Sequence, residues 1–300
     1  MNQATPWHGR ARRLLIAAVP TWARVTGPLA VTVALGIALS AAITPLASAA
    51  PTASDPAAQP AVAAQPFKGV AGPACGDVTR LNLSWYYNWW ISPGSCTAPG
   101  FVPTISGKSE KTAGDIGWAL DQIRKSGYGT VLGFNEPNKA DQANMTVARA
   151  IELWPALTAD PNIRVSSPST SGDGQAWFTE FLRQADAKKL RVDFLNIHWY
   201  GWNAGSCDAN AASFESYLRW AESLPGNRPI WITEFGCMNQ SNPNRATVQA
   251  FYSAALRVLA RHPRVERHSW YPYLANNELV ESGGALTPLG TIVANAPANR

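Results

Sequence analysis

Residues 131–138 read Val-Leu-Gly-Phe-Asn-Glu-Pro-Asn, a mostly apolar run that ends on Glu136 and Pro137. Residues 230–236, Ile-Trp-Ile-Thr-Glu-Phe-Gly, have the same form, and Glu234 closes that apolar run. Apolar runs of this length are typical of strands buried on both faces, as in a parallel sheet. Proline cannot continue a hydrogen-bond ladder, so the first of these strands is expected to stop before Pro137.

Eight segments have the composition of β-strands, each rich in Val, Ile, Phe, Trp or Tyr. They are Phe67–Ala71, Leu81–Tyr86, Phe101–Ile105, Thr130–Asn135, Ile163–Pro168, Val192–Trp199, Pro229–Glu234 and Arg267–Tyr273. Helical patterns separate the later strands, at Thr112–Lys125, Thr146–Thr158, Gln175–Leu190, Ala211–Leu224 and Arg245–Arg261. This alternation predicts an α/β fold, a single compact (β/α)8 TIM barrel. The first two strands start too close together for a full crossover helix, so the first βα units are expected to be trimmed.

Composition excludes several classes of protein. The 300 residues are 46% hydrophobic and 15% charged, which suffices for a sizeable core and is too little charge for a disordered chain. The formal net charge is +5, but the excess lies mostly in arginines near the N-terminus, and Lys and Arg never form a run longer than two. We therefore expect no nucleic-acid partner, no multi-span membrane protein and no coiled coil.

The first residues are predicted to be an export signal, residues 1–49. Four arginines precede an apolar run at 29–46, and Ala-Ser-Ala at 47–49 supplies a cleavage site. A retained membrane anchor is the alternative, because the run approaches the length of a span, but Pro45 and the cleavage site favour removal. Residues 50–66 are an Ala/Pro-rich linker. The mature protein is expected to be secreted, with no stable membrane span after processing.

Four cysteines, Cys75, Cys96, Cys207 and Cys237, all lie in the exported part. An even count in an oxidising compartment predicts two disulfides, with three possible pairings. Loops that follow neighbouring parallel strands lie close together, which favours Cys75–Cys96 and Cys207–Cys237. Neither a C-x-x-C nor an H-E-x-x-H motif is present, so we expect no metal site.

Glu136 and Glu234 end two of the predicted strands, and in a barrel the active site lies at the C-terminal ends of the strands. Alone, either residue could equally be a solvated loop carboxylate or part of an ion pair. Two carboxylates on opposed sides of the open end of a barrel are the groups that glycoside hydrolysis needs. One protonates the leaving oxygen, and the other attacks the anomeric carbon. The pair therefore favours a glycosidase site.

Several stretches carry a resemblance to a known family. They are Lys68-Gly-Val-Ala71, Trp85-Tyr-Tyr-Asn-Trp89, Phe101-Val-Pro103, Leu132–Asn138, Gln142-Ala-Asn-Met145, Asp193–Tyr200 and Trp231–Gly236. From about residue 67 to 291 the chain resembles glycoside hydrolase family 128, the fungal and bacterial endo-β-1,3-glucanases. The resemblance implies that residues 67–300 are a catalytic domain using retaining double displacement.

The resemblance also implies roles for individual residues. Glu136 would be the general acid/base and Glu234 the nucleophile. Asn135 would hold the sugar 2-hydroxyl, and His198 or Tyr200 would touch the nucleophile. No cofactor is implied, because both catalytic groups are side chains.

Aromatic residues near the strand ends are expected to stack on sugar rings. Trp89, Trp199 and Trp270 are predicted to face the substrate, and Asn88, beside Trp89, is expected to bind it. Trp85 and Trp231 are expected in the barrel core.

These features together predict a secreted, monomeric, retaining endo-β-1,3-glucanase whose partner is a polysaccharide. One alternative is a related enzyme that acts on β-1,4-glucan, mannan or xylan. Another is a non-catalytic β-glucan-binding protein at the cell surface, although such a protein would tend to lose one carboxylate and this chain keeps both.

Overall fold

The computed structural model describes residues 66–203, 205–238 and 243–298. The predicted signal peptide and the predicted linker, apart from residue 66, lie outside the described residues. Within the described part of the chain, no helix has both the length and the apolar character needed to cross a membrane.

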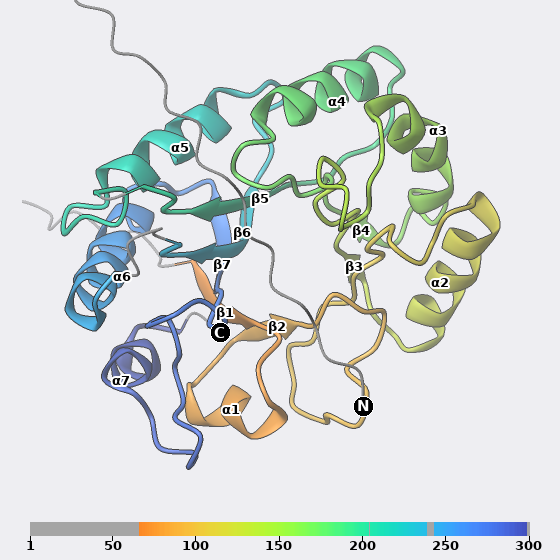
Figure 1. Cartoon of the computed structure of the whole chain (residues 1–300). Helices are drawn as coiled ribbons and strands as arrows, with labels where there is room; N and C mark the ends of the chain where they lie inside the picture. The colour runs from red at the N-terminus through yellow and green to blue at the C-terminus, as the bar shows by residue number, and fades with distance from the viewer. Residues whose placement is uncertain (1–65, 204, 239–242, 299–300) are drawn as a thin grey trace, which may run out of the picture. The chain divides into compact units, whose positions relative to one another are not determined.

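Strands and helices alternate along the described chain, and the helices are arranged around the strands (Figure 1). The strands are β1 (Phe67–Ala71), β2 (Trp85–Tyr87), β3 (Thr130–Val131), β4 (Arg164–Val165), β5 (Leu195–Tyr200), β6 (Ile230–Gly236) and β7 (Val265–Trp270). The helices are α1 (Cys75–Arg80), α2 (Ala113–Lys125), α3 (Val147–Leu157), α4 (Gln175–Ala187), α5 (Ala212–Ser223), α6 (Arg245–Leu259) and α7 (Pro288–Asn295). All five predicted helices are confirmed, and α1 and α7 are additional.

The strands are parallel and form two sheets. One has the order β2-β1-β7-β6-β5, and the other is the pair β3-β4. Isolated parallel bridges lie between the two sheets. They are Tyr86↔Phe101, Thr104↔Leu132 and Ser166↔Phe194. The predicted parallel α/β fold is therefore confirmed.

The prediction of a full strand at Phe101–Ile105 is wrong, because that segment makes only isolated bridges in the described structure. Pro103 interrupts it, since proline has no N–H to donate to a ladder. β4 is also shorter than expected, because serine side chains replace backbone acceptors beyond it. The N–H of Gly133 donates to Oγ of Ser166, and the N–H of Asn196 donates to Oγ of Ser167, both at 2.8 Å.

Helix starts follow recognisable capping residues. α2 begins with a capping box in which Thr112 and Asp115 exchange side-chain and backbone hydrogen bonds. Asn244 caps α6 by accepting from the N–H of Thr247. At the other end of the chain, the buried ammonium of Lys68 donates to the carbonyls of Val293 and Ala296 and so ties the end of α7 to β1.

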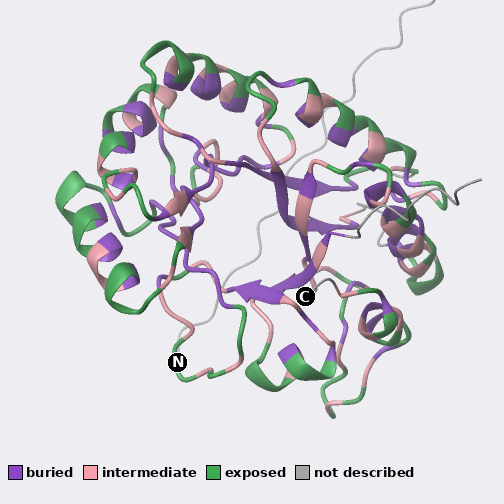
Figure 2. Cartoon of the chain, turned by 180° about the vertical axis from the view of Figure 1, so that it is seen from behind, coloured by how far each residue is buried: buried purple, intermediate pink, exposed green. Residues whose placement is uncertain are grey.

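The buried residues form two layers, and the helices turn their exposed faces outward (Figure 2). The larger layer packs the helices onto the strands. The smaller is a cluster drawn from segments all along the chain, and it lies among the strands: Ala71, Trp85, Tyr87, Val102, Leu132, Phe194 and Trp231. Trp85 and Trp231 are thus core residues, as predicted. This rigid centre supports the ends of the strands, where the predicted site residues lie.

Candidate active site

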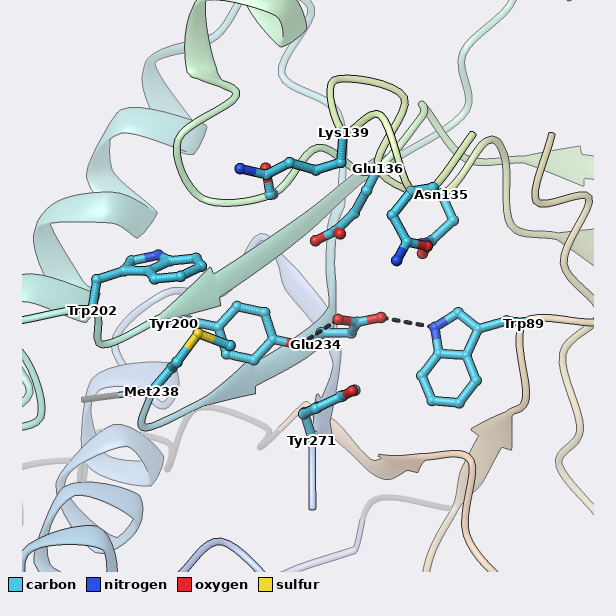
Figure 3. Close-up of a pocket in the computed structure, with 11 residues that line it drawn as sticks. Trp89, Asn135, Glu136, Lys139, Tyr200, Trp202, Glu234, Met238 and Tyr271 are labelled. Carbon is cyan, nitrogen blue, oxygen red and sulfur yellow. Dashed lines mark hydrogen bonds between the residues drawn. The ribbon is translucent and has the colours of Figure 1, made fainter. Parts of the chain in front are cut away.

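The carboxylates of Glu136 and Glu234 face the same pocket, as Figure 3 shows. Glu234 lies in β6, and Glu136 lies in the segment that follows β3. One oxygen of each carboxylate and one ring nitrogen of His198 all lie within 4.8 Å of one another. The pocket has a volume of about 350 Å³. Its lining residues are Trp89, Asn135, Glu136, Lys139, Gln142, Ser171, Tyr200, Trp202, Glu234, Met238 and Tyr271.

Glu234 is surrounded by donors. Its Oε1 accepts from Nε1 of Trp89 at 2.8 Å and from the hydroxyl of Tyr87 at 3.1 Å, and its Oε2 accepts from the hydroxyl of Tyr200. Burial first, and then the charge of Glu234, raises the pKa of Tyr87 and of Tyr200 well above the ordinary value, so both hydroxyls keep their protons. The carboxylate is therefore held by three donors, with its charge compensated.

Glu136 is the more open of the two carboxylates. Its side chain is 16% exposed, against 6% for Glu234. Its backbone lies in the left-handed region with φ 42°, and its N–H donates to the carbonyl of Ser169 at 2.7 Å. Trp89, which also lines the pocket, has a left-handed backbone as well, with φ 60°. Non-glycine residues adopt this conformation rarely, and such residues gather at functional sites.

His198 lies between the two carboxylates and is fully buried. Its Nδ1 is 3.2 Å from Oε1 of Glu136 and 3.4 Å from Oε2 of Glu234. Burial by itself lowers the pKa of His198, but the charges of Glu234 and Glu136 and the hydrogen bond to Glu136 together raise it above the ordinary value. Nδ1 of His198 therefore lies within contact distance of both carboxylates, and the three groups are close enough to share a proton.

Asn135 lines the pocket next to Glu136, and its Nδ2 donates to Oε1 of Gln142 at 3.4 Å. Of the other predicted substrate-binding residues, Trp89 and Tyr200 also line the pocket. The structure thus brings together Asn135, Trp89, Tyr200 and the two glutamates.

Two predicted substrate-facing tryptophans do not line this pocket, which corrects the expectation. Trp199 stacks on Phe251 at a centroid distance of 5.2 Å. Trp270 is fully buried, and its Nε1 donates to the carbonyl of Asn277 at 2.9 Å. Side chains alternate between the two faces of a strand, and the residues that follow Trp199 and Trp270, Tyr200 and Tyr271, line the pocket instead.

Asn88 is also not among the pocket-lining residues. Its Nδ2 donates to the carbonyl of Ser92 at 2.9 Å, and its Oδ1 accepts from the N–H of Trp90. It shapes the turn that presents Trp89.

Sequence reasoning did not assign a role to several lining residues: Lys139, Gln142, Ser171, Met238 and Tyr271. Trp202, which follows β5, is among the aromatic residues expected to stack on sugar rings, and it lines the pocket. The signal for Tyr271 was present in the alternation of its strand, since it follows the buried Trp270. Lys139 and Ser171 come from loops that meet only in the fold. There, Lys139 pairs with Asp173 at 2.6 Å, and Ser171 also bonds to Asp173.

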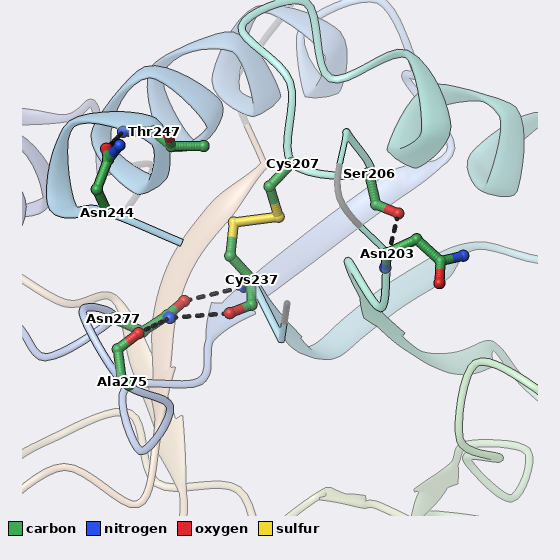
Figure 4. Close-up of a disulfide and its surroundings, with 8 residues drawn as sticks. All are labelled: Asn203, Ser206, Cys207, Cys237, Asn244, Thr247, Ala275 and Asn277. Atoms are coloured by element: carbon green, nitrogen blue, oxygen red, sulfur yellow. Dashed lines mark hydrogen bonds between the residues drawn. A yellow bond between two sulfur atoms is a disulfide. The ribbon is translucent and has the colours of Figure 1, made fainter. Parts of the chain in front are cut away.

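Both predicted disulfides, Cys75–Cys96 and Cys207–Cys237, are confirmed. Figure 4 shows the second, which joins the segments that follow β5 and β6. The side chain of Asn277 accepts from the N–H of Cys237 at 2.9 Å and donates to its carbonyl at 3.1 Å. Two kinds of tie therefore fix the backbone three residues beyond Glu234.

Comparison with known proteins gives consistent matches. A family model described as the glycosyl hydrolase catalytic core matches residues 66–292. A solved endo-β-1,3-glucanase of glycoside hydrolase family 128, subgroup I, from Amycolatopsis mediterranei in complex with laminaritriose is 32% identical. The match covers 77% of this chain and 99% of that one, with a TM-score of 0.67.

Two further relatives differ in activity or length. A curdlan-specific exo-β-1,3-glucanase of subgroup III from Blastomyces gilchristii is 28% identical, with a TM-score of 0.64 over 76% of this chain and 97% of that one. The curated Alkali-sensitive linkage protein 1 of Schizosaccharomyces pombe is 28% identical over 228 residues, which are 70% of this chain and 40% of that protein. The chain therefore spans less than half the length of this relative.

Proposed function

The chain matches the glycosyl hydrolase catalytic core and belongs to glycoside hydrolase family 128, and on that premise we propose that it is a secreted endo-β-1,3-glucanase that retains anomeric configuration. It is a glycoside hydrolase. The observation that carries the proposal is the placement of Glu136 and Glu234 in one pocket, with carboxylate oxygens within 4.8 Å. Retaining enzymes hold their carboxyl groups about 5–5.5 Å apart, whereas inverting enzymes need about 6.5–9.5 Å to admit a water molecule.

In the first step, a carboxylate oxygen of Glu234 attacks the anomeric carbon. The bond to the glycosidic oxygen breaks, and Glu136 gives its proton to that leaving oxygen. In the second step, a water molecule attacks the same carbon, Glu136 takes the proton from the water, and the bond to Glu234 breaks. The three donors on Glu234 support the nucleophilic role, and the greater exposure of Glu136 supports contact with leaving group and water.

Asn135 is assigned to the 2-hydroxyl of the reacting sugar, as the family resemblance implies, and its place beside Glu136 on the wall of the pocket supports that role. A hydrogen bond there strengthens as the ring approaches the oxocarbenium ion. Trp89 is assigned to sugar binding as well, because its indole both borders the pocket and holds Glu234.

The cleft supports endo action on a long chain. A second pocket of about 260 Å³ shares Trp89, Asn135 and Gln142 with the first, so the two adjoin. Trp202, 38% exposed, lines the first pocket, and Trp90, 46% exposed, lines the second. Indoles that remain exposed beside a cleft can stack on sugar rings. The relatives solved with laminari-oligosaccharides favour β-1,3-glucan as the substrate.

We assign the architecture to a closed (β/α)8 barrel. The parallel bridges at Phe101, Thr104 and Ser166 support closure, because they fall in the two gaps between the sheets. The position of the site at the carboxyl ends of β3 and β6 is that of barrel enzymes.

The proposal also includes processing and partners. Residues 1–49 would be removed on export, residues 50–66 would act as a linker, and the catalytic domain would work as a monomer without a cofactor. Two disulfides support an oxidising compartment.

The test is reducing-sugar release by the full chain from β-1,3-glucan, mixed-linkage glucan, cellulose, mannan and xylan. Release from β-1,3-glucan, with mostly long early products, is the expected result. Release from another polymer only would reassign the substrate, and monomeric glucose as the sole early product would reassign the action as exo. Glucan binding without release would favour a binding protein.

A further inference from the structure

Strand β6 carries one extra residue at Thr233. Against β5, Ile232 pairs with Ile197 and Glu234 pairs with His198, so Thr233 has no partner in this register. The register of β6 against β7 shifts in the same stretch. A β-bulge re-aims side chains, and bulges are common next to active sites. Here the bulge lets the consecutive side chains of Thr233 and Glu234 both contact His198.

Thr233 joins His198 to Asn196 through two hydrogen bonds. The Thr233 hydroxyl donates its single proton to Oδ1 of Asn196 at 2.6 Å. Its oxygen is therefore left to accept in the 2.9 Å contact with Nε2 of His198. All three residues are at most 2% exposed, so bulk water does not compete for these bonds. Nε2 of His198 must carry a proton in this arrangement.

The other ring nitrogen faces the two catalytic carboxylates. With Nε2 protonated, a neutral His198 would direct the lone pair of Nδ1 at Glu136 and Glu234, at 3.2 and 3.4 Å. Nδ1 and the two carboxylates would then be three neighbouring acceptors with no proton between them, and they would repel one another. A second proton, besides the one on Nε2, is therefore expected to be shared by these three groups. Glu136 from the loop after β3 and Glu234 from β6 are the charged groups that contact His198, and Tyr87 and Tyr200 bond to Glu234.

We propose that Asn196 and Thr233 are positioning residues that keep a proton on Nε2 of His198, so that Nδ1 of His198 stores the proton that Glu136 passes to the leaving group. The inference rests on the proposed function. Before bond cleavage, the Nδ1–H bond breaks and an O–H bond forms on Glu136, leaving a neutral imidazole. During the second step, the proton that Glu136 takes from water returns to Nδ1.

Three substitutions separate this role from a structural one. Thr233→Val keeps the shape but removes the acceptor, so the proton of neutral His198 should move to Nδ1, where it holds Glu136 as a carboxylate. Thr233→Ser keeps the hydroxyl and is the matched control. Asn196→Asp keeps the acceptor and adds a negative charge, which favours the doubly protonated ring.

The first measurement is the ¹⁵N shift of the two ring nitrogens of His198 across pH in the full chain, assigned by their loss in His198→Gln. The second is the pH profile of kcat/KM on laminarihexaose. We expect Nε2 protonated in the wild type and in Thr233→Ser. We expect the alkaline limb to move down by about one pH unit in Thr233→Val, a loss of about tenfold on that limb, and up in Asn196→Asp.

The proposal is overturned if Nε2 of the wild type carries no proton, or if Thr233→Val matches Thr233→Ser in both measurements. Asn196→Asp, which shifts the profile the opposite way, keeps the test decisive if Thr233→Val does not fold. The expected ring protonation in a chain that hydrolyses no glucan would uphold the Asn196–Thr233 relay and overturn the proposed function, so the two failures are distinguishable.

Discussion

Nε1 of Trp89 donates a 2.8 Å hydrogen bond to Oε1 of Glu234, joining residues that lie 145 positions apart in the chain (Figure 3). Trp89 reaches that carboxylate from the turn after β2, where its backbone is left-handed and the side chain of Asn88 holds the turn. One residue therefore borders the cleft and holds the carboxylate of Glu234, the proposed nucleophile. Its substitution should affect chemistry more than folding.

The pair Trp89→Phe and Trp270→Phe tests this distinction. Trp89→Phe removes the donor that holds Oε1 of Glu234, so the carboxylate can move out of its attacking position, and kcat/KM on β-1,3-glucan should fall by about 10- to 100-fold, a larger effect than the change in Tm. Trp270→Phe leaves a cavity in the core and should cost about 1–3 kcal/mol of stability while activity per folded molecule persists. Measuring kcat/KM on β-1,3-glucan and Tm for both variants tests this contrast. The reverse pattern would return Trp270 to the substrate cleft.

Glu136→Gln should fail mainly on substrates with poor leaving groups. Without the acid, hydrolysis of β-1,3-glucan should fall by about 10²- to 10⁴-fold. An aryl β-laminaribioside, whose acidic phenol leaves without protonation, should still release a burst of that phenol. Stopped-flow absorbance measures the burst, and Glu281→Gln, on the surface beside Arg245, is the matched control. A variant equally slow on both substrates would remove Glu136 from the acid role.

The two disulfides should differ in their effect on catalysis. Replacing either pair by serine should cost about 2–4 kcal/mol of unfolding free energy. Only loss of Cys207–Cys237 should also lower kcat, because Cys237 follows Glu234 by three residues and anchors that segment. Denaturant unfolding and steady-state kinetics on the two double variants compare them. An equal kcat in both would mean that Asn277 alone suffices to hold the segment that follows Glu234.

His268 should make the fold sensitive to acid. Burial, and then the charge of Lys68, lowers the pKa of His268 to about 3. Between its ordinary value near 6.5 and that value, the unfolded chain takes up a proton that the folded chain does not. The free energy of unfolding should therefore decrease as the pH is lowered through this window, by up to about 1.4 kcal/mol per pH unit.

Denaturant unfolding of the wild type and His268→Gln at several pH values measures that slope. Below pH 6.5, His268→Gln should lack the part of this acid destabilisation that comes from His268. His198→Gln is a useful contrast, because the raised pKa of His198 stabilises the fold below its ordinary pKa and that contribution is lost as pH rises through the folded value. An unchanged slope in His268→Gln would show that other groups control acid stability.

Local patterns were enough to predict much of the fold. Apolar runs predicted the parallel strands, and the ends of two of them predicted where Glu136 and Glu234 lie. Topology then gave the disulfide pairing, because consecutive parallel strands place their following loops side by side. The orientation of Trp199 was also open to prediction, since His198 and Tyr200 on either side of it were expected at the site.

Other features depend on the folded chain. The bulge at Thr233 breaks the alternation of β6, and no local pattern marks it, because the extra residue is defined only by the register of neighbouring strands. α7 is short, and its position depends on Lys68, a residue more than two hundred positions away. The meeting of Lys139 with Asp173 likewise depends on two loops that only tertiary packing brings together.

The most direct test of whether Glu136 and Glu234 retain the anomeric configuration is an early time course of laminarihexaose digestion by the full chain, in which ¹H NMR follows the new reducing ends. Hydrolysis through double displacement predicts that β-anomers appear first and that α-anomers grow in only by mutarotation. New reducing ends that appear first as α-anomers would show inversion, and a hexasaccharide that stays intact would show no hydrolysis. Either result would rule out double displacement by this pair.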